Sequence, residues 1–357
     1  KKMTYFLNLL VLTCLLTTSA FSAIDTNKLT IGGTYLGVFN SFEENQTQFD
    51  YAANIDFSYS VNNDLTTQIQ LQTGAGNGSI GLGGPQVALK DIVLIYSPTL
   101  NGRKINITFG SFDTPFGYDS NNISNNADTF NTAFILNSLP YSALDGQMSQ
   151  LNTLGLKLEN SFKYLDLKTV ISNGTSETAY NESRTFEKLT QLSLHSFIKN
   201  LRITGSIFNS DDLDDTQDSL QANVDATLLE LNYELLSWYE FKYKVYNFYF
   251  DDGTSSEDNT KAYEFEINYD KNPIIVGLRA SFWRPESQTM SAATPSPSLL
   301  STTSNSDKVD RYQLTTGYYI DPNILVKLEL ASEVTETNNG SSKETNNGFI
   351  TGVNVRF

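Results

Sequence analysis

Two residue types with reactive side chains are almost missing from the chain: Cys14 is its only cysteine and His195 its only histidine. A lone cysteine inside an apolar run supports neither a disulfide framework nor a Cys-ligated metal site. Hydrolytic sites commonly need a histidine base beside a serine or an aspartate. His195 is expected on the polar face of a strand with Gln191 and Ser193, where a polar side chain needs no catalytic role. The sequence therefore predicts no enzyme, no catalytic residue and no cofactor.

Basic residues are also scarce, with 24 Lys and Arg against 40 Asp and Glu and a net charge of −16. Lys1 and Lys2 fall in a segment that we expect to be removed, which leaves a net charge of −18. An acidic chain is a poor partner for nucleic acid. The same excess of acids favours a surface or channel that prefers cations.

No apolar run long enough for a membrane helix follows residue 23. At the start, two lysines precede an apolar stretch over 5–16, and small residues follow up to Ala23. This order is typical of a secretory signal. We expect a signal peptide over 1–23, cleaved near Ser22 or Ala23, and one domain over 24–357. If that domain lies in a membrane, it has to be a closed β-barrel. Lipid offers no hydrogen-bond partners to the backbone N–H and C=O groups, so neighbouring strands have to supply all of them.

Apolar and polar residues alternate with a period of two in many segments of the chain. Between residues 48 and 61, Phe, Tyr, Ile and Val alternate with mostly polar residues, and the pattern resumes at residue 65 after a turn of two asparagines and an aspartate. Such alternation is typical of strands with one apolar and one polar face. Sixteen segments of this kind are predicted, over 28–40, 48–61, 65–74, 87–97, 104–111, 151–160, 163–173, 188–198, 201–208, 221–233, 236–250, 260–270, 274–284, 310–320, 324–333 and 348–357.

The connections between these segments alternate between short and long. Seven are short, at 62–64, 98–103, 161–162, 199–200, 234–235, 271–273 and 321–323. Eight are longer, at 41–47, 75–86, 112–150, 174–187, 209–220, 251–259, 285–309 and 334–347. This pattern predicts an antiparallel meander with tight turns at one end and loops at the other. Alternation is poor over 90–95 and 226–236, so fourteen or eighteen strands also remain open.

Two local features carry a resemblance to a known family. The last predicted strand ends on Phe357, on the same face as Phe349, and resembles the signal that the barrel-assembly machinery of Gram-negative outer membranes reads. A second segment is similar to the G-x-F-x-x-P-F-G segment of phosphate-selective porins and their relatives, through Gly110, Phe112, Pro115, Phe116 and Gly117. With the sixteen-segment layout and the long third loop, the mature chain resembles a Gram-negative porin.

The resemblance implies an all-β transmembrane antiparallel barrel of about 16 strands with a long third external loop. It implies a porin of the bacterial outer membrane, whose water-filled channel passes small hydrophilic solutes and ions by diffusion. It also implies a homotrimer, contacts with outer-membrane lipid and lipopolysaccharide, and assembly by the barrel-assembly machinery with Phe357 as the signal.

The loop over 112–150 is the predicted constriction of the channel. No Lys or Arg occurs between Lys104 and Lys157, so the chain departs here from phosphate-selective porins, whose pores are lined by bases. The loop offers four acids instead, namely Asp113, Asp119, Asp128 and Asp145. These acids would favour cations at the narrowest point.

The predicted pore wall consists of bases on the polar faces of the strands. They are Lys157, Lys168, Arg202, Lys242, Lys244, Arg279, Arg311 and Arg356. Acids on the loop and bases on the facing wall would set up a transverse field across the channel. The alternative is that the bases pair locally with acids of the same wall, namely Glu159, Asp166, Glu240, Glu264 and Glu266.

Three further interpretations stay open. An acidic loop could hold Ca²⁺ or Mg²⁺ through Asp211, Asp212, Asp214 and Asp215, although their spacing matches no EF-hand. A substrate-selective channel for a sugar, organic acid, phosphate or siderophore could use aromatic residues expected on polar faces, namely Phe197, Trp283 and Tyr319. An adhesin or structural barrel would need the third loop to fill the lumen.

Overall fold

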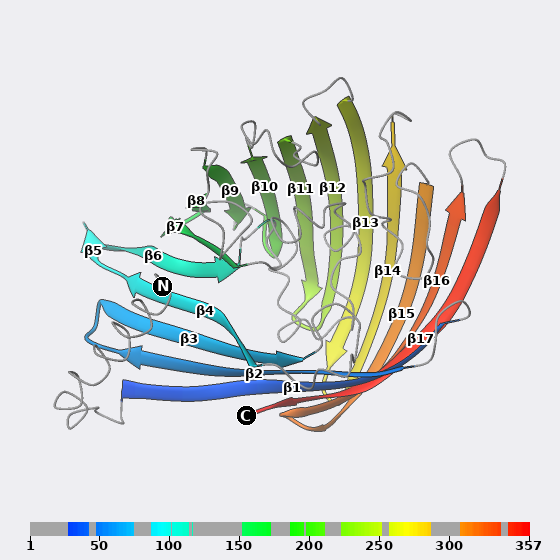
Figure 1. Ribbon diagram of the computed structural model, residues 1–357, viewed down its shortest axis with the longest axis horizontal. Helices are drawn as coiled ribbons and strands as arrows, with labels where there is room; N and C mark the ends of the chain where they lie inside the picture. Colours follow the sequence, from blue (N-terminus) through cyan, green and yellow to red (C-terminus); the bar gives the residue numbers. More distant parts are fainter. Residues whose placement is uncertain are drawn as a thin grey trace, which may run out of the picture.

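The protein is described by a computed structural model that covers residues 28–42, 48–74, 87–100, 102–113, 116, 152–172, 186–195, 198–210, 223–251, 257–286, 308–336 and 342–357 (Figure 1). The predicted segment 1–23 lies outside these residues. The strands are β1 (Leu29–Phe42), β2 (Gln48–Ser60), β3 (Leu65–Gly74), β4 (Val87–Tyr96), β5 (Thr99–Leu100), β6 (Arg103–Asp113), β7 (Asn152–Ser161), β8 (Leu165–Ser172), β9 (Glu187–His195), β10 (Leu201–Ser210), β11 (Asn223–Leu236), β12 (Tyr239–Asp251), β13 (Glu257–Lys271), β14 (Ile274–Pro285), β15 (Lys308–Asp321), β16 (Ile324–Glu336) and β17 (Lys343–Arg356).

The strands form a closed ring. Each pairs antiparallel with its neighbours along the chain, and β1 pairs with both β2 and β17. The two-residue β5 pairs with the start of β6, just beyond the end of β4, so β4 and β5 are two pieces of one wall strand. The structure is therefore a closed antiparallel barrel of sixteen strands, which confirms the predicted fold class. Within the described part of the chain, each of the sixteen wall strands therefore has a partner strand on both sides.

The predicted segments match the sixteen wall strands one by one, with shifts of a few residues at their ends. One shift matters for the channel, because β6 continues through Asp113, whose backbone pairs with Asn152 of β7. Asp113 therefore belongs to the barrel wall, and the prediction that placed it in the loop is wrong on this point. The connection after β6 begins at residue 114 and reaches residue 151.

Both stretches of poor alternation contain a β-bulge. In β4 the pairing with β3 skips Lys90, and in β11 the pairing with β12 skips Leu235. An extra residue in one strand breaks the period of two locally, while the ladder resumes on either side. A bulge within the strand therefore accounts for part of each irregular pattern, and the count of sixteen stands.

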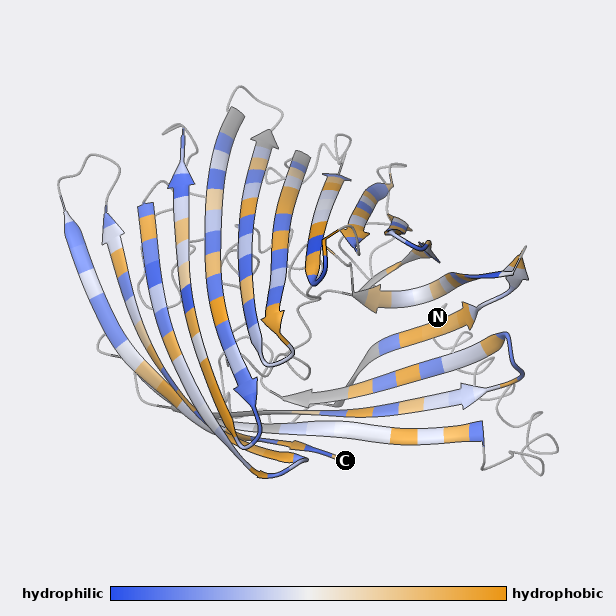
Figure 2. Cartoon of the chain, turned by 180° about the vertical axis from the view of Figure 1, so that it is seen from behind, coloured by the Kyte–Doolittle hydropathy of each residue, from blue (hydrophilic) through white to orange (hydrophobic). Residues whose placement is uncertain are grey.

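The distribution of side chains is the reverse of that in a water-soluble protein. Leu278, Leu314 and Leu330 are 40–48% exposed on the outer face, whereas Arg311 beside them on the inner face is 1% exposed. Figure 2 shows the same alternation as a change between hydrophilic and hydrophobic colours along the strands. An apolar outside around a charged inside is the arrangement of a barrel in lipid. Within the described part of the chain, no helix has the length and apolar character needed to cross a membrane.

The ring closes at a seam between β1 and the end of the chain. The backbone of Phe357 donates to the carbonyl oxygen of Gly33 at 3.0 Å and accepts from the Gly33 N–H at 2.9 Å. A Cβ atom on Gly33 would lie 2.4 Å from the carbonyl oxygen of Asn54 and 2.6 Å from the Phe357 ring. Gly33 therefore makes the room in which the Phe357 ring crosses β1.

Gly110, in the segment that resembles phosphate-selective porins, also has a physical role. Its φ is +136°, and a Cβ atom there would lie 2.0 Å from the carbonyl oxygen of Ile92. Only glycine fits this conformation and this close approach of β6 to β4. Glycine is therefore required at a position within β6, before the connection that follows this strand.

Candidate channel lining

The inner wall is best described in rows, because paired residues on neighbouring strands point to the same face. Two adjacent rows run across β11 to β16 and carry charges of alternating sign. One row contains Lys242, Glu266, Arg279 and Gln313, and the next contains Glu230, Lys244, Glu264, Ser281, Arg311 and Glu333. We call these two rows the ion belt. It holds four bases and four acids and has no net charge.

Short ion pairs connect the ion belt. Lys244 Nζ lies 3.0 Å from Glu264 Oε1, and Arg279 Nη2 lies 2.6 Å from Glu266 Oε1. Arg311 donates through Nε and Nη2 to Glu333 Oε2. Glu264 also accepts from the Ser281 hydroxyl at 3.3 Å. Charged side chains with several charge-assisted hydrogen bonds are held in fixed positions, so the ion belt is a rigid part of the wall.

Seven of the eight bases predicted for the pore wall make ion pairs with inner-wall acids. Besides the pairs above, Lys157 and Lys168 lie 3.5 and 3.6 Å from Glu159, Arg202 lies 4.0 Å from Asp166, and Lys242 lies 3.0 Å from Glu240. The eighth, Arg356, stands opposite Thr34 at the seam. This is the local pairing that the sequence left as an alternative. Pairing with acids of the same wall reduces the electric field of these bases across the lumen.

The pairs differ sharply in their access to water. In β7, β8 and β10 the side chains of Lys157, Lys168 and Arg202 are 21–30% exposed. In the ion belt the basic side chains are only 1–6% exposed. Gln68 of β3, also on the inner face, is exposed. Water therefore reaches Gln68 of β3 and the charged pairs of β7, β8 and β10, and not the basic side chains of the ion belt.

His195 lies on the inner face next to these exposed pairs. Its Nε2 is 3.3 Å from Asp166 Oδ2, and the hydroxyl of the nearby Ser193 is hydrogen-bonded to Thr204 at 2.9 Å. The expected inward direction of His195, Gln191 and Ser193 agrees with their pairing and burial. His195 is part of a polar network on the wall.

An apolar layer lies beside the ion belt, toward the end with the long connections. Tyr246 and Phe248 of β12 stack with ring centroids 5.9 Å apart, and Phe248 packs on Trp283 of β14 at 5.7 Å. We call these three residues the aromatic row. The row belongs to a buried cluster that also contains Val93, Phe112, Phe116, Val170, Leu189, Phe208, Ala226, Leu228, Ala262 and Val309.

Phe116 connects the start of the 114–151 connection to the wall of β12. Its ring centroid is 6.5 Å from that of Tyr246, and its side chain is 2% exposed. In the ring of strands β6 and β12 are separated by β7–β11, so Phe116 reaches inward from one wall to another. This position supports the predicted inward course of the third loop at the one residue of the connection that the structure describes.

Several predicted site residues lie outside the described residues. They include Asp119, Asp128 and Asp145 of the connection, Phe197, and the acidic set Asp211, Asp212, Asp214 and Asp215. Within the residues that are described, no group of three His, Asp or Glu side chains is placed to hold a metal ion. The role of these residues stays a prediction.

Comparison with known proteins places the fold. No family model and no curated protein matches the chain. OmpF of Salmonella typhi, in complex with daunomycin, superposes with a TM-score of 0.65 at 13% identity, over 92% of this chain and 97% of that one. OmpT, an outer-membrane protein of Vibrio cholerae, gives 0.62 at 13% over 92% and 97%, and the anion-selective porin of Comamonas acidovorans gives 0.62 at 10% over 92% and 99%. The chain has a porin fold. At these identities the likeness shows the fold alone.

Within the porin fold, sequence reasoning found Trp283 but missed Tyr246 and Phe248. The sequence contained a signal for both residues. Tyr246 and Phe248 follow Lys242 and Lys244 at steps of two along β12, so all four side chains point to the same face of the strand. Aromatic residues on the charged face of a strand cannot point into lipid. The poor alternation near residue 228 has the same origin, since Ala226 and Leu228 also point inward and join the apolar layer.

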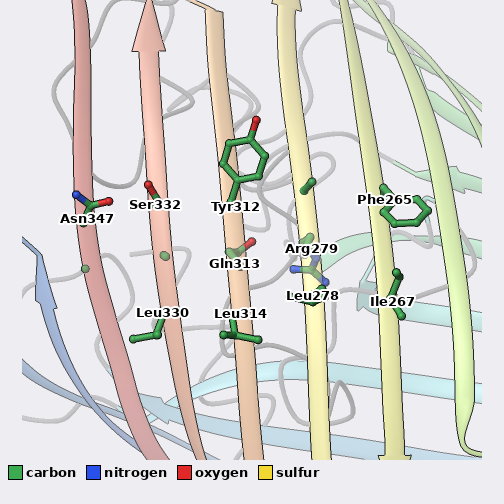
Figure 3. A pocket seen from close by; sticks show the side chains of 13 residues that line it. Phe265, Ile267, Leu278, Arg279, Tyr312, Gln313, Leu314, Leu330, Ser332 and Asn347 are labelled. Atoms are coloured by element: carbon green, nitrogen blue, oxygen red, sulfur yellow. The ribbon is translucent and has the colours of Figure 1, made fainter.

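A concavity of about 670 Å³ lies against the outer face of the wall. It is lined by residues of β13–β17, among them the outward Phe265, Tyr312 and Leu330, and Figure 3 shows these three on neighbouring strands. Its lining also includes the small residues Ala280 and Ser332. An apolar hollow on this face suits lipid chains, so it adds nothing to solute selection.

Proposed function

We propose that the chain is an outer-membrane porin whose channel passes small hydrophilic solutes and ions by passive diffusion. The observation that carries this proposal is the closed sixteen-stranded ring with leucines outside and paired charges inside. A barrel of this size encloses a lumen wide enough for water. The partly exposed charged pairs of β7, β8 and β10 support an aqueous path along that side of the lumen.

The proposal includes a preference for cations. The chain carries 40 acids against 24 bases, whereas the ion belt is neutral. The preference would therefore depend on acids outside the ion belt, with Asp113, Asp119, Asp128 and Asp145 as our candidates for the constriction. We do not assign catalysis to the barrel, and a structural role of His195 accounts for its contacts.

The proposed surroundings follow from an outer-membrane location. The outer face would contact lipid and lipopolysaccharide, and the protein would assemble as a homotrimer. The Phe357 ring is 67% exposed at the seam, where the barrel-assembly machinery could contact it. Under this proposal Phe357→Asp lowers the yield of folded, heat-modifiable barrel without blocking export. A normal yield would remove the signal role from Phe357.

The decisive experiment is a recording from the purified, folded chain in a planar lipid bilayer. We expect stepwise conductance that is proportional to voltage and increases with KCl concentration. The same preparation unfolded by heat serves as the control. Insertion confirmed by protease protection, without any conductance step, would contradict the diffusion channel and favour a barrel with a filled lumen.

A second candidate is a substrate-selective channel. The aromatic row favours it, because a channel for ions alone has no evident need for stacked rings on its inner wall. The same recording distinguishes the two, since a selective channel is blocked saturably by one class of solute.

A further inference from the structure

The concavity on the outer face, which we call the outer hollow, is lined by large and small side chains in turn. One outward row across β13–β17 lines it, and its members are Phe265, Ala280, Tyr312, Ser332 and Asn347. Three leucines of the adjacent outward row also line it, namely Leu278, Leu314 and Leu330. Its volume of about 670 Å³ lies within the range of about 300–1,000 Å³ that is usual for ligand pockets. The outer hollow therefore has the size and the apolar lining of a ligand site.

A column of polar side chains leads from the outer hollow toward the end of the barrel with the long connections. Lys343, Thr345 and Asn347 stand at alternate positions of β17 and are exposed, whereas Asn346 is buried on the inner face. Figure 3 shows the Tyr312 hydroxyl pointing along the strands in the same direction. Lys343 precedes Asn347 by four residues, which is about 13 Å along a strand.

Lys343 is the base of this region that remains available for an anion. Four bases lie on the outer face at this end of β13–β17, and three of them form ion pairs, namely Lys261 with Glu286, Arg284 with Asp310 and Lys308 with Glu336. Lys343 forms no ion pair with any residue that the structure describes. Its neighbour Glu344 has the parity of the inner face. A single positive charge therefore stands at the top of the polar column.

The depth of the outer hollow fits one leaflet of a bilayer. The hydrocarbon core is about 30 Å thick, so one leaflet contributes about 15 Å. A phosphate at Lys343 would be about 13 Å from Asn347 along the strand, which places the acyl chains of the same molecule at the level of the outer hollow. Phe282 and Tyr312, whose ring centroids are 6.0 Å apart, lie between these two levels. Aromatic residues mark the same boundary in other outer-membrane barrels.

We infer that the outer hollow and Lys343 together form a binding site for one lipid whose headgroup carries a phosphate. An acyl chain occupies the hollow, and the phosphate accepts hydrogen bonds from the ammonium of Lys343 and the hydroxyl of Thr345. The Tyr312 hydroxyl donates to an ester oxygen of the chain. A second copy of the barrel fits this face less well, because its leucine-covered surface would bury Lys343 without a counter-charge. The inference rests on the proposed membrane location and does not need the barrel to conduct.

Binding is measured by native mass spectrometry on the full folded chain, released from micelles of a neutral detergent. The probe is dioleoyl phosphatidic acid. Dioleoylglycerol has the same chains without the phosphate, and inorganic phosphate has no chain. We expect one saturable site for phosphatidic acid, weaker binding of dioleoylglycerol, and no adduct with inorganic phosphate.

Two pairs of variants separate the headgroup from the chain. Lys343→Gln should weaken the binding of phosphatidic acid by about 2- to 10-fold, the effect of one hydrogen bond to a charged group, and leave dioleoylglycerol unaffected. Lys261→Gln, which removes a paired base at the same end, is its control. Ser332→Leu fills the hollow and should weaken both lipids, whereas Thr67→Leu on the outer face of β3 should weaken neither. Ala280→Leu replaces Ser332→Leu if that variant is not heat-modifiable.

The inference is overturned if dioleoylglycerol or inorganic phosphate binds as well as phosphatidic acid. It is also overturned if Lys343→Gln behaves as Lys261→Gln does, or if Ser332→Leu reduces the number of associated copies while lipid binding stays the same, which would make the hollow a contact between copies. Bilayer recordings test the channel separately. A barrel that binds phosphatidic acid without conducting keeps the site and removes the proposed channel, and one that conducts without this binding does the reverse.

Discussion

Gly33 is the residue on which closure of the ring depends most directly. Adding one methyl group there brings Cβ within 2.4 Å of the Asn54 carbonyl oxygen, a backbone atom that cannot rotate away. We predict that Gly33→Ala lowers the yield of folded barrel and the temperature at which it unfolds. Gly205 of β10 is the control, since no atom lies within 4 Å of a Cβ built there.

The measurement is the fraction of each variant that migrates as the folded form in gel electrophoresis without boiling. Gly205→Ala should match the parent chain. Equal behaviour of the two variants would mean that the contact of Gly33 with Asn54 and Phe357 is relieved at no cost, and that the seam is looser than the structure describes.

Two consecutive residues of β3 test which face of the wall meets lipid. Ile69 is 42% exposed on the outer face, and its neighbour Gln68 is exposed to the lumen. Ile69→Lys should destabilise the barrel in lipid vesicles by about 2–4 kcal/mol if it lies near the bilayer midplane, whereas Gln68→Lys should cost little. Unfolding by urea in vesicles measures both. A larger cost for Gln68→Lys would reverse the assignment of the faces.

At the scale of elements, the ion belt joins β11–β16 through side chains as well as backbone. Arg311 is 1% exposed and pairs with Glu333 of β16. Arg311→Met should cost about 3–5 kcal/mol, because it removes the charge that Glu333 is paired with while that carboxylate stays buried. The double variant Arg311→Met/Glu333→Leu should recover most of this loss, since it removes both charges.

Lys308→Met is the control for this prediction. Lys308 pairs with Glu336 between the same two strands at 3.9 Å, but its side chain is 48% exposed. Its removal should cost less than about 1 kcal/mol. The double-mutant cycle in urea would contradict a tightly coupled belt if the Arg311 and Glu333 substitutions were simply additive.

The sequence predicts the elements well because the barrel wall repeats one rule. Lipid on one face and a polar lumen on the other impose the period of two in every strand, and turns interrupt it at regular distances. Lys90 and Leu235 break the rule only because they are bulged residues. Their effect on the pattern was visible, but no single sequence distinguishes a bulge from a missing strand.

The channel lining was less predictable, because it depends on which inner residues become neighbours. Parity places Lys244 and Glu264 inward, but their 3.0 Å ion pair requires the register between β12 and β13. The contact between Phe116 and Tyr246 is harder still, since it joins residues far apart in sequence across the lumen. Pairing across the ring and the course of the third connection are properties of the closed barrel.

For the molecule as a whole, the distribution of charge predicts modest cation selectivity that is strongest in dilute salt. Seven of the eight bases predicted for the pore wall form ion pairs, and two unit charges about 4 Å apart interact by only ~1 kcal/mol in water. Salt screens charges beyond about 8 Å at physiological ionic strength. Long-range preference should therefore come from the acids that we propose for the constriction, where solutes would pass close to them.

Replacing Asp113, Asp119, Asp128 and Asp145 together by Asn tests this source of selectivity. The zero-current potential in a KCl gradient should shift toward anions, while the conductance keeps its order of magnitude because the ion belt and the barrel are unchanged. Lys308→Met is again the control, since it changes an exposed charge at a strand end by one unit. If the parent channel prefers anions, or if the fourfold variant keeps the parent's zero-current potential, these four acids do not control which ions pass.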